Sequence, residues 1–458
     1  MTPALSLDSS RVRTLSLLML VAAVYAGSLG ASFQFDDWNV IVGNPGVHSW
    51  TAWWERMPGI RPLLKATYVA SWTAGWGPAG FRAVNIALHA MNAWLLLLAV
   101  ERVLRLCGLP EDRARFAAWF AAAVFALHPA QTETVTYISG RSGGLMTTFL
   151  LLALIAHMRR DDSRRPAGWT ALAVAAFICA FGAKENAWTF PFTVLAIEAA
   201  RAQRGPRTPW RASLPYFVAL LCGAMAALSI PGYRVLLGTS LETRTALENL
   251  LTQIDGQFYL LTHPLFTLQT NADPDLPVRL HWTRDLWPAA LTLAGLAAIA
   301  VWQWAGRRWL SLGIVWYFVQ LSATNSVVPR LDVANDRQLY LALAGPAWML
   351  GAALGSVDSR SLRAAACVSV FAALAAATVM RNGDYRTETS FWESAARVSP
   401  GKARVWNNLG YARQSSGDIP GARQAYERAL QLDPDHIKAR INLSTLEDAA
   451  PAAASPMR

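Results

Sequence analysis

The sequence predicts an all-α membrane protein, in which a bundle of about eleven transmembrane helices precedes a short array of helical repeats. Of its 458 residues, 53% are hydrophobic and only 16% are charged, whereas soluble domains carry roughly 25% charged residues. The 20 Trp residues also favour a membrane protein, because Trp concentrates where the bilayer meets water. Near the C-terminus, a period of 34 residues indicates the repeats.

Apolar runs of membrane length recur along most of the chain. A bilayer core needs roughly 20 apolar residues per helix. The predicted spans are about 14–33, 81–101, 115–129, 143–157, 167–182, 186–200, 212–230, 286–305, 309–328, 339–357 and 362–380. The first run is longer than the core of a signal peptide and lacks a clear small-residue cleavage site after it, so we expect a retained anchor helix.

Arginine clusters fall in every second loop. They are Arg11 and Arg13; Arg102, Arg105, Arg113 and Arg115; Arg159, Arg160, Arg164 and Arg165; Arg201, Arg204, Arg207 and Arg211; Arg307 and Arg308; and Arg360 and Arg363. This dispersal explains the net charge of +11 by the positive-inside rule and argues against nucleic-acid binding. We therefore expect a multi-pass plasma-membrane protein with a cytoplasmic N-terminus. Its Arg-rich, Lys-poor composition favours a bacterial inner membrane.

The remaining charged segments lie in the alternate, extracytoplasmic loops of a transmembrane domain that spans residues 1–382. The first outer loop, about 34–80, mixes Trp with Arg and Lys and predicts helices that lie in the membrane interface. A second long outer loop covers about 231–285.

Residues 383–448 are predicted to form tetratricopeptide repeats. The residues at the expected offsets are Trp406, Leu409, Gly410, Ala422, Tyr426, Ala429 and Pro434. One full repeat is flanked by two half repeats. Because about three repeats are needed for stability alone, we expect the array to rest on the membrane domain or on a partner. Residues 449–458 are predicted to be a disordered tail.

Two adjacent acids, Asp36 and Asp37, follow the first span in the stretch FQFDDW. They are either the solvated end of a helix or a functional pair. A carboxylate near the membrane surface can serve as the general base for an incoming hydroxyl. Paired acids can also bind Mg²⁺ or Mn²⁺. No second set of ligands accompanies them, so no metal-ligating residues are assigned, and a divalent metal cofactor remains an alternative.

Further ionisable residues occupy the other outer loops. They are His128, Glu133 and Arg141 in HPAQTETVTYISGR, Lys184 and Glu185 in AKEN, and Arg330 and Arg337 in PRLDVANDR. An arginine such as Arg141 can grip a phosphate with two parallel hydrogen bonds, and Lys184 can supply a point charge. The alternatives are a capping or packing role for His128, a local ion pair at the Lys184–Glu185 turn, and a simple polar loop around Arg330.

Acids and cations on one face of a membrane suit one type of reaction. A hydroxyl attacks the anomeric carbon of a sugar carried on a polyprenyl phosphate, a carboxylate takes the proton, and Arg or Lys stabilises the departing phosphate. The sequence has no nucleotide-binding glycine loop, which favours a lipid-linked donor.

The order of motifs is distinctive: FDDWNVIVGNP, RPL, HPAQTETVTYISGR, GAKENA and NDRQLYL, followed by tetratricopeptides. It resembles the transmembrane and tetratricopeptide-repeat O-mannosyltransferase-like family over about residues 14 to 445. The resemblance implies a GT-C fold, a polyprenyl-phosphate sugar donor, an inverting mechanism and a base that is either Asp36 or Asp37. The residues that match outer-face motifs of the family are Glu133, Arg141, Lys184, Glu185 and Arg337.

The expected partners are the lipid-linked sugar, membrane lipids, an acceptor protein or envelope glycan, and a protein bound by the repeats. The chain departs from the family in having about two repeats where other members often have many. Two alternative functions remain at this point. One is a non-enzymatic envelope scaffold that recruits partners through its repeats. The other is a transporter or flippase for a lipid-linked precursor.

Overall fold

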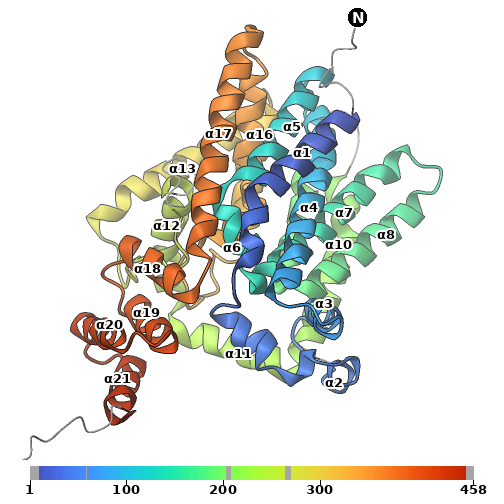
Figure 1. Ribbon diagram of the computed structural model, residues 1–458. Helices are drawn as coiled ribbons and strands as arrows, with labels where there is room; N and C mark the ends of the chain where they lie inside the picture. The colour runs from blue at the N-terminus through green and yellow to red at the C-terminus, as the bar shows by residue number, and fades with distance from the viewer. Residues whose placement is uncertain (1–9, 58, 203–207, 264–269, 450–458) are drawn as a thin grey trace, which may run out of the picture.

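The computed structural model describes residues 10–57, 59–202, 208–263 and 270–449. Within these ranges the secondary structure is helical and contains no β-strand, which confirms the all-α class. Figure 1 shows long helices packed into a bundle, with the C-terminal helices and the short helices α2, α3 and α11 gathered at the end opposite the start of α1.

Seven helical segments of the described residues are long and apolar enough to cross a membrane. They are built on α1 (Ser10–Tyr25), α4 (Pro78–Leu106), α7 (Arg141–Arg159), α8 (Pro166–Ala183), α10 (Pro209–Ser229), α13 (Trp287–Trp302) and α17 (Arg360–Asp384). The predicted count of eleven is therefore not confirmed.

The other four predicted spans coincide with shorter helices. These are α5 (Glu111–Leu127), α9 (Phe190–Ala202), α14 (Arg308–Ser322) and α16 (Ala344–Leu354). Each apolar run extends past at least one end of its helix. The run at 115–129, for example, ends in the His128-Pro129 turn, where proline keeps its predecessor out of the helical region. An apolar run measures burial, and here buried turns extend it beyond the helix.

Proline also marks where many helices begin. It occupies the first or second position of α3 (Pro62–Thr73), α4, α8, α10, α11 (Pro231–Thr243), α13 and α20 (Ile419–Leu432). An N-terminal proline loses no helical hydrogen bond, because the first amide groups of a helix have no partner within it.

The outer segments carry the remaining helices. The first outer loop holds α2 (Trp50–Glu55) and α3, and the segment 231–285 holds α11 and α12 (Ala246–Thr262). Two very short helices lie in the motifs HPAQTETVTYISGR and NDRQLYL; they are α6 (Thr132–Val135) and α15 (Leu339–Ala342). The repeats comprise α18 (Glu388–Val398), α19 (Ala403–Ser415), α20 and α21 (Ile437–Ala449). Except for Ala449, the predicted disordered tail lies outside the described residues.

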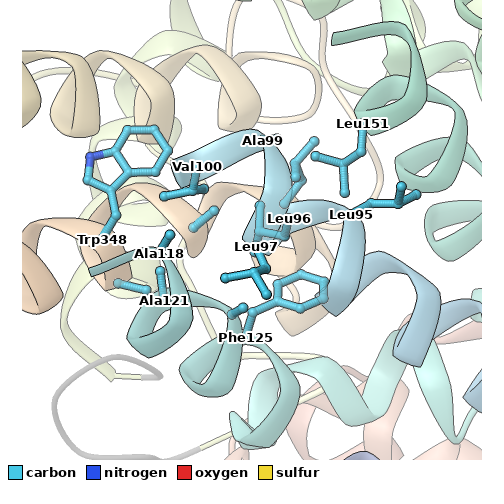
Figure 2. Close-up of a cluster of buried hydrophobic side chains, with 14 of the residues drawn as sticks. Leu95, Leu96, Leu97, Ala99, Val100, Ala118, Ala121, Phe125, Leu151 and Trp348 are labelled. Atoms are coloured by element: carbon cyan, nitrogen blue, oxygen red, sulfur yellow. The ribbon is translucent and has the colours of Figure 1, made fainter. Parts of the chain in front are cut away.

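The main core lies where α4, α5, α7 and α16 meet. Figure 2 shows Leu96 and Leu97 of α4 beside Ala118 and Phe125 of α5, with Trp348 of α16 close by. Helix α5 is rich in buried alanine, and small residues let membrane helices approach closely.

The tetratricopeptide array packs against the membrane domain, as the shortness of the array led us to expect. Tyr137, from the motif HPAQTETVTYISGR, shares a buried cluster with Phe391 and Trp392 of α18. The ring of Phe35, in the first outer loop, lies edge-on to Trp392 with 5.2 Å between centroids.

We predict that Gly345→Val destabilises the bundle by about 1–3 kcal/mol, the usual range for overpacking a core. A Cβ at Gly345 of α16 would overlap the carbonyl oxygen of Gly313 in α14. Thermal unfolding of the detergent-solubilised protein measures the effect. Gly295→Val in α13 is the control, because a Cβ there meets nothing within 4 Å. Equal losses in the two variants would contradict the close α14–α16 contact.

Candidate active site

A cavity of about 640 Å³ lies among the outer segments, between the first outer loop, α11 and the loop before α15. Its charged lining residues are Asp36, Arg61, Lys65, Lys184, Arg330, Asp332 and Arg337. Four of the predicted site residues are among them: Asp36, Lys184, Arg330 and Arg337. The volume is within the range of small-molecule sites, and the lining carries more cations than carboxylates.

The two adjacent acids have different surroundings. The Asp37 side chain is completely buried. Its Oδ1 accepts hydrogen bonds from the amide (2.8 Å) and hydroxyl (2.5 Å) of Ser139, and its Oδ2 accepts one from the amide of Gln34 at 3.1 Å. Burial raises the pKa of Asp37 to about 6, although these hydrogen bonds oppose the rise. Asp37 thus ties the first outer loop to the ISGR motif.

Asp36 faces the cavity instead. Its backbone amide donates to the Tyr137 hydroxyl at 3.0 Å, which fixes the backbone, while its half-buried side chain is part of the cavity wall. Within the described part of the chain, no group donates a hydrogen bond to its carboxylate. The preceding Phe35 has φ of 45°, a left-handed conformation that is costly for a residue with a Cβ. The contact of its ring with Trp392 helps to hold this turn.

Lys184 is a cation of the cavity wall without a local partner for its charge among the described residues. It follows the last turn of α8, and its ammonium has neither a hydrogen bond nor an ion pair among the described residues. Desolvation, together with the nearby Arg61, Arg337 and Arg330, lowers the pKa of Lys184 to about 7. An anion in the cavity would relieve this repulsion.

Glu133 supports Arg337 from behind the cavity wall. Its carboxylate is 4% exposed and accepts a hydrogen bond from the backbone amide of Arg337 at 3.0 Å, and the Arg337 Nε lies 3.5 Å from its other oxygen. A second carboxylate, Asp332, accepts from Arg337 Nη2 at 3.3 Å. Burial raises the pKa of Glu133, while Arg337 opposes that rise. Glu133 therefore positions Arg337 without lining the cavity itself.

Glu185 supports Arg61 in the same way. The Arg61 guanidinium donates two hydrogen bonds to the Glu185 carboxylate, at 2.8 and 2.5 Å. Desolvation opposes ionisation of Glu185, but Arg61 more than offsets it and lowers the pKa to about 2. Neither Arg61 nor Lys65 was predicted from the sequence to be a site residue. The RPL motif and the four-residue spacing of these cations, which puts both on one helix face, were the available signals.

Two predicted phosphate-binding residues do not line the cavity. Arg141 has no exposed side-chain surface, and its guanidinium donates to Asn85 Oδ1 and the carbonyl of Phe81, both at 2.8 Å, and to Ser71 Oγ at 3.2 Å. His128 is also buried, and its Nδ1 accepts from the amide of Ala130 at 3.2 Å. This contact matches the capping role that we considered as its alternative.

No group of three or more His, Cys, Asp or Glu side chains in the described ranges is arranged to hold a metal ion. The charged chemistry of the cavity consists of one carboxylate, Asp36, that is available to accept a proton, and several cations that can bind an anion.

These features define a class: a multi-pass helical membrane protein with a cavity lined mainly by cations at one end and tetratricopeptides docked beside it. Residues 403–436 match the tetratricopeptide repeat family. The chain is similar to protein O-mannosyl-transferase TMTC3 of Mus musculus, at 24% identity over 93% of this chain and 52% of that protein. It is similar to TMTC3 of Homo sapiens at 23% identity, with the same two coverages.

Protein O-mannosyl-transferase F38B6.6 of Caenorhabditis elegans is 24% identical over 93% of this chain and 64% of that protein. These similarities confirm the resemblance inferred from the sequence motifs. The chain spans about half the length of the first two of these relatives. No solved structure matches the chain.

We predict that Asp37→Ala lowers the free energy of unfolding by about 1–3 kcal/mol, because it leaves the buried amides of Ser139 and Gln34 without an acceptor. Asp36→Ala is the matched control, one residue away, and should leave the melting temperature close to that of the unaltered protein. Thermal unfolding in detergent compares the two. The reverse order of stabilities would contradict the separate roles of the two acids.

Proposed function

We propose that this chain is an integral-membrane glycosyltransferase, which moves a sugar from a polyprenyl-phosphate donor to an acceptor hydroxyl with inversion. The observation that carries the proposal is the cavity in which Asp36, a carboxylate with no hydrogen-bond donor among the described residues, accompanies a cluster of cations. The names of the similar proteins support mannose as the sugar and a protein hydroxyl as the acceptor.

In the proposed reaction, the acceptor oxygen attacks the anomeric carbon on the side opposite the phosphate. The bond from that carbon to the phosphate oxygen breaks, and its electron pair leaves with the polyprenyl phosphate. Asp36 takes the proton of the acceptor hydroxyl as the new bond forms, which is the role of a general base. The configuration at the anomeric carbon is inverted.

The cations of the cavity stabilise the charge that develops on the leaving phosphate. Lys184 and Arg330 have no carboxylate within ion-pair distance among the described residues, and Arg337 is held from behind by Glu133. Fixed charges in a poorly hydrated site stabilise a transition state more strongly than the same charges in water. Arg61 forms part of the cavity wall, and its Nε and Nη2 both donate hydrogen bonds to Glu185.

Two smaller cavities lie between the charged site and the apolar bundle. The first, of about 30 Å³, shares Lys184 and Arg337 with the main cavity and also touches Gln320 and Leu341. The second, of about 10 Å³, shares Gln320 and Leu341 and is otherwise lined mainly by apolar side chains of α7, α9 and α14. The cavities thus form a series that runs from the charged site toward the apolar bundle.

We also propose that the cavity opens to the extracytoplasmic side of the plasma membrane, the inner membrane in a bacterium. The arginine clusters of the alternate loops support this orientation through the positive-inside rule. A lipid-linked sugar and an acceptor outside the cytoplasm would meet at this face.

Asp36→Asn should lower the transfer rate by about 10²–10⁴-fold, the usual contribution of a general base. The variant keeps the size of the side chain and removes its ability to accept the proton. Transfer of radiolabelled mannose from polyprenyl phosphate mannose to a Ser/Thr-containing acceptor protein, in proteoliposomes, measures the loss. Asp358→Asn, in an exposed loop before α17, is the control. Unchanged transfer by Asp36→Asn would reject Asp36 as the base.

The pKa of Lys184, about 7, predicts a pH dependence of donor binding. The lysine is charged below this pKa and loses its charge as the pH rises through it. The KM for the donor should therefore rise by up to about tenfold between pH 6 and pH 8. Lys184→Arg keeps its charge over this range, and its KM should stay nearly constant. Parallel pH profiles for the two proteins would show that Lys184 does not bind the phosphate.

A further inference from the structure

The tetratricopeptide array contacts the membrane domain at two places close to the cavity. In one, Trp392 of α18 packs against Phe35, the residue before Asp36. In the other, Arg404 of α19 donates to Asp332 Oδ1 at 2.6 Å. Asp332 and Arg337 both line the cavity, so this second contact joins the array to the charged site.

Arg404 is firmly held. Its guanidinium also donates to both oxygens of Asp273, at 2.7 and 2.5 Å, and Lys402 pairs with the same carboxylate. Asn271, in the same segment as Asp273, donates to Ser399 Oγ at 2.7 Å. The contacts of Asn271 and Asp273 therefore fix the start of α19 against the membrane domain. Arg404 cannot move away without breaking several charged contacts.

Asp332 is shared between two guanidinium groups. Its Oδ1 accepts from Arg404 at 2.6 Å and its Oδ2 accepts from Arg337 at 3.3 Å. The shorter contact is the one to the array, so Arg404 holds the carboxylate and Arg337 is only weakly engaged by it. Without Arg404, Arg337 is the guanidinium group that still hydrogen-bonds this carboxylate, and the two would pair closely. Such a pair would neutralise Arg337 and draw it away from an anion in the cavity.

We propose that the array is a positioning element of the cavity, in which Arg404, acting through Asp332, keeps Arg337 available to the donor phosphate. This inference rests on the proposed function. It gives the first repeat helix pair a role in the chemistry of the site that is separate from the binding of any partner.

Arg404→Gln in the full-length protein should weaken binding of polyprenyl phosphate, the leaving product, by at least about fivefold, the lower end of measured couplings between sites. Binding is measured as the ligand-induced rise in melting temperature, without any transfer reaction. Arg413→Gln is the matched control, since Arg413 pairs with Glu393 inside the array and lies outside the cavity lining. It should leave this affinity unchanged.

A double-mutant cycle separates positioning from general loosening of the fold. In an Arg337→Gln background, Arg404→Gln should have no further effect on affinity, because the group on which it acts is gone. Arg404→Lys retains the positive charge but lacks the several N–H donors of a guanidinium group. Its affinity for polyprenyl phosphate should therefore lie between those of Arg404→Gln and the unaltered protein. Additive losses in the double variant, or equal losses in Arg404→Gln and Arg413→Gln, would overturn the inference.

The two proposals fail in different ways. If the unaltered protein binds no polyprenyl phosphate, the proposed donor is wrong and the inference falls with it. If the unaltered protein binds it and Arg404→Gln binds it equally well, the donor proposal stands and the positioning role of Arg404 is rejected.

Discussion

The positions of the carboxylates behind the cavity wall decide what the cavity can bind. Glu133 holds Arg337 through its backbone amide, and Glu185 holds Arg61 through two hydrogen bonds. Removing a charge from water is costly unless a partner compensates it, so cations at this depth need nearby acids. Because these acids approach from outside the cavity, the cations are stabilised while their other faces remain available. The result is a positively charged cavity beside an apolar bundle. Asp36 and Asp332 are the acids that line it, and both interact electrostatically with Arg337.

The residues that resemble catalytic groups in the sequence divide into two kinds. Arg141 uses its guanidinium to join α7 to Asn85 and the carbonyl of Phe81 in α4, and Asp37 joins the first outer loop to Ser139. The contacts of Asp37 fix the loop that carries Asp36, and those of Arg141 fix the start of α7 against α4. A motif can therefore combine one residue that meets the substrate with another that holds the backbone in place, and both kinds are needed for the site.

The sequence was enough to predict the helical class, the repeats and the collection of charged groups in the outer loops. These follow from the hydrophobic composition, from the 34-residue period of the repeats and from the alternation of Arg-rich loops with the other loops. It could not separate Asp36 from Asp37, since their directions depend on the left-handed turn at Phe35 and on the donors supplied by Ser139. Arg61 and Lys65 were missed because a Trp-rich amphipathic segment predicts a helix in the membrane interface. The same pattern results whether or not the polar face of the helix lines a cavity. The predicted count of eleven spans is not confirmed, because four of the apolar runs coincide with shorter helices of the described residues. Hydrophobicity reports burial and does not report where a buried chain leaves the helix.

The docked array changes how the membrane domain is to be understood. Two helix pairs are too few to be stable alone, so the contacts of Trp392 and Arg404 with the membrane domain also stabilise the array. The same contacts reach Phe35, the residue before Asp36, and Asp332, which lines the cavity. Any change that undocks the array must therefore release both the turn before Asp36 and the Asp332 carboxylate. The stability of the repeats and the geometry of the cavity are thus coupled through a few side chains, and neither can be altered at these points without the other.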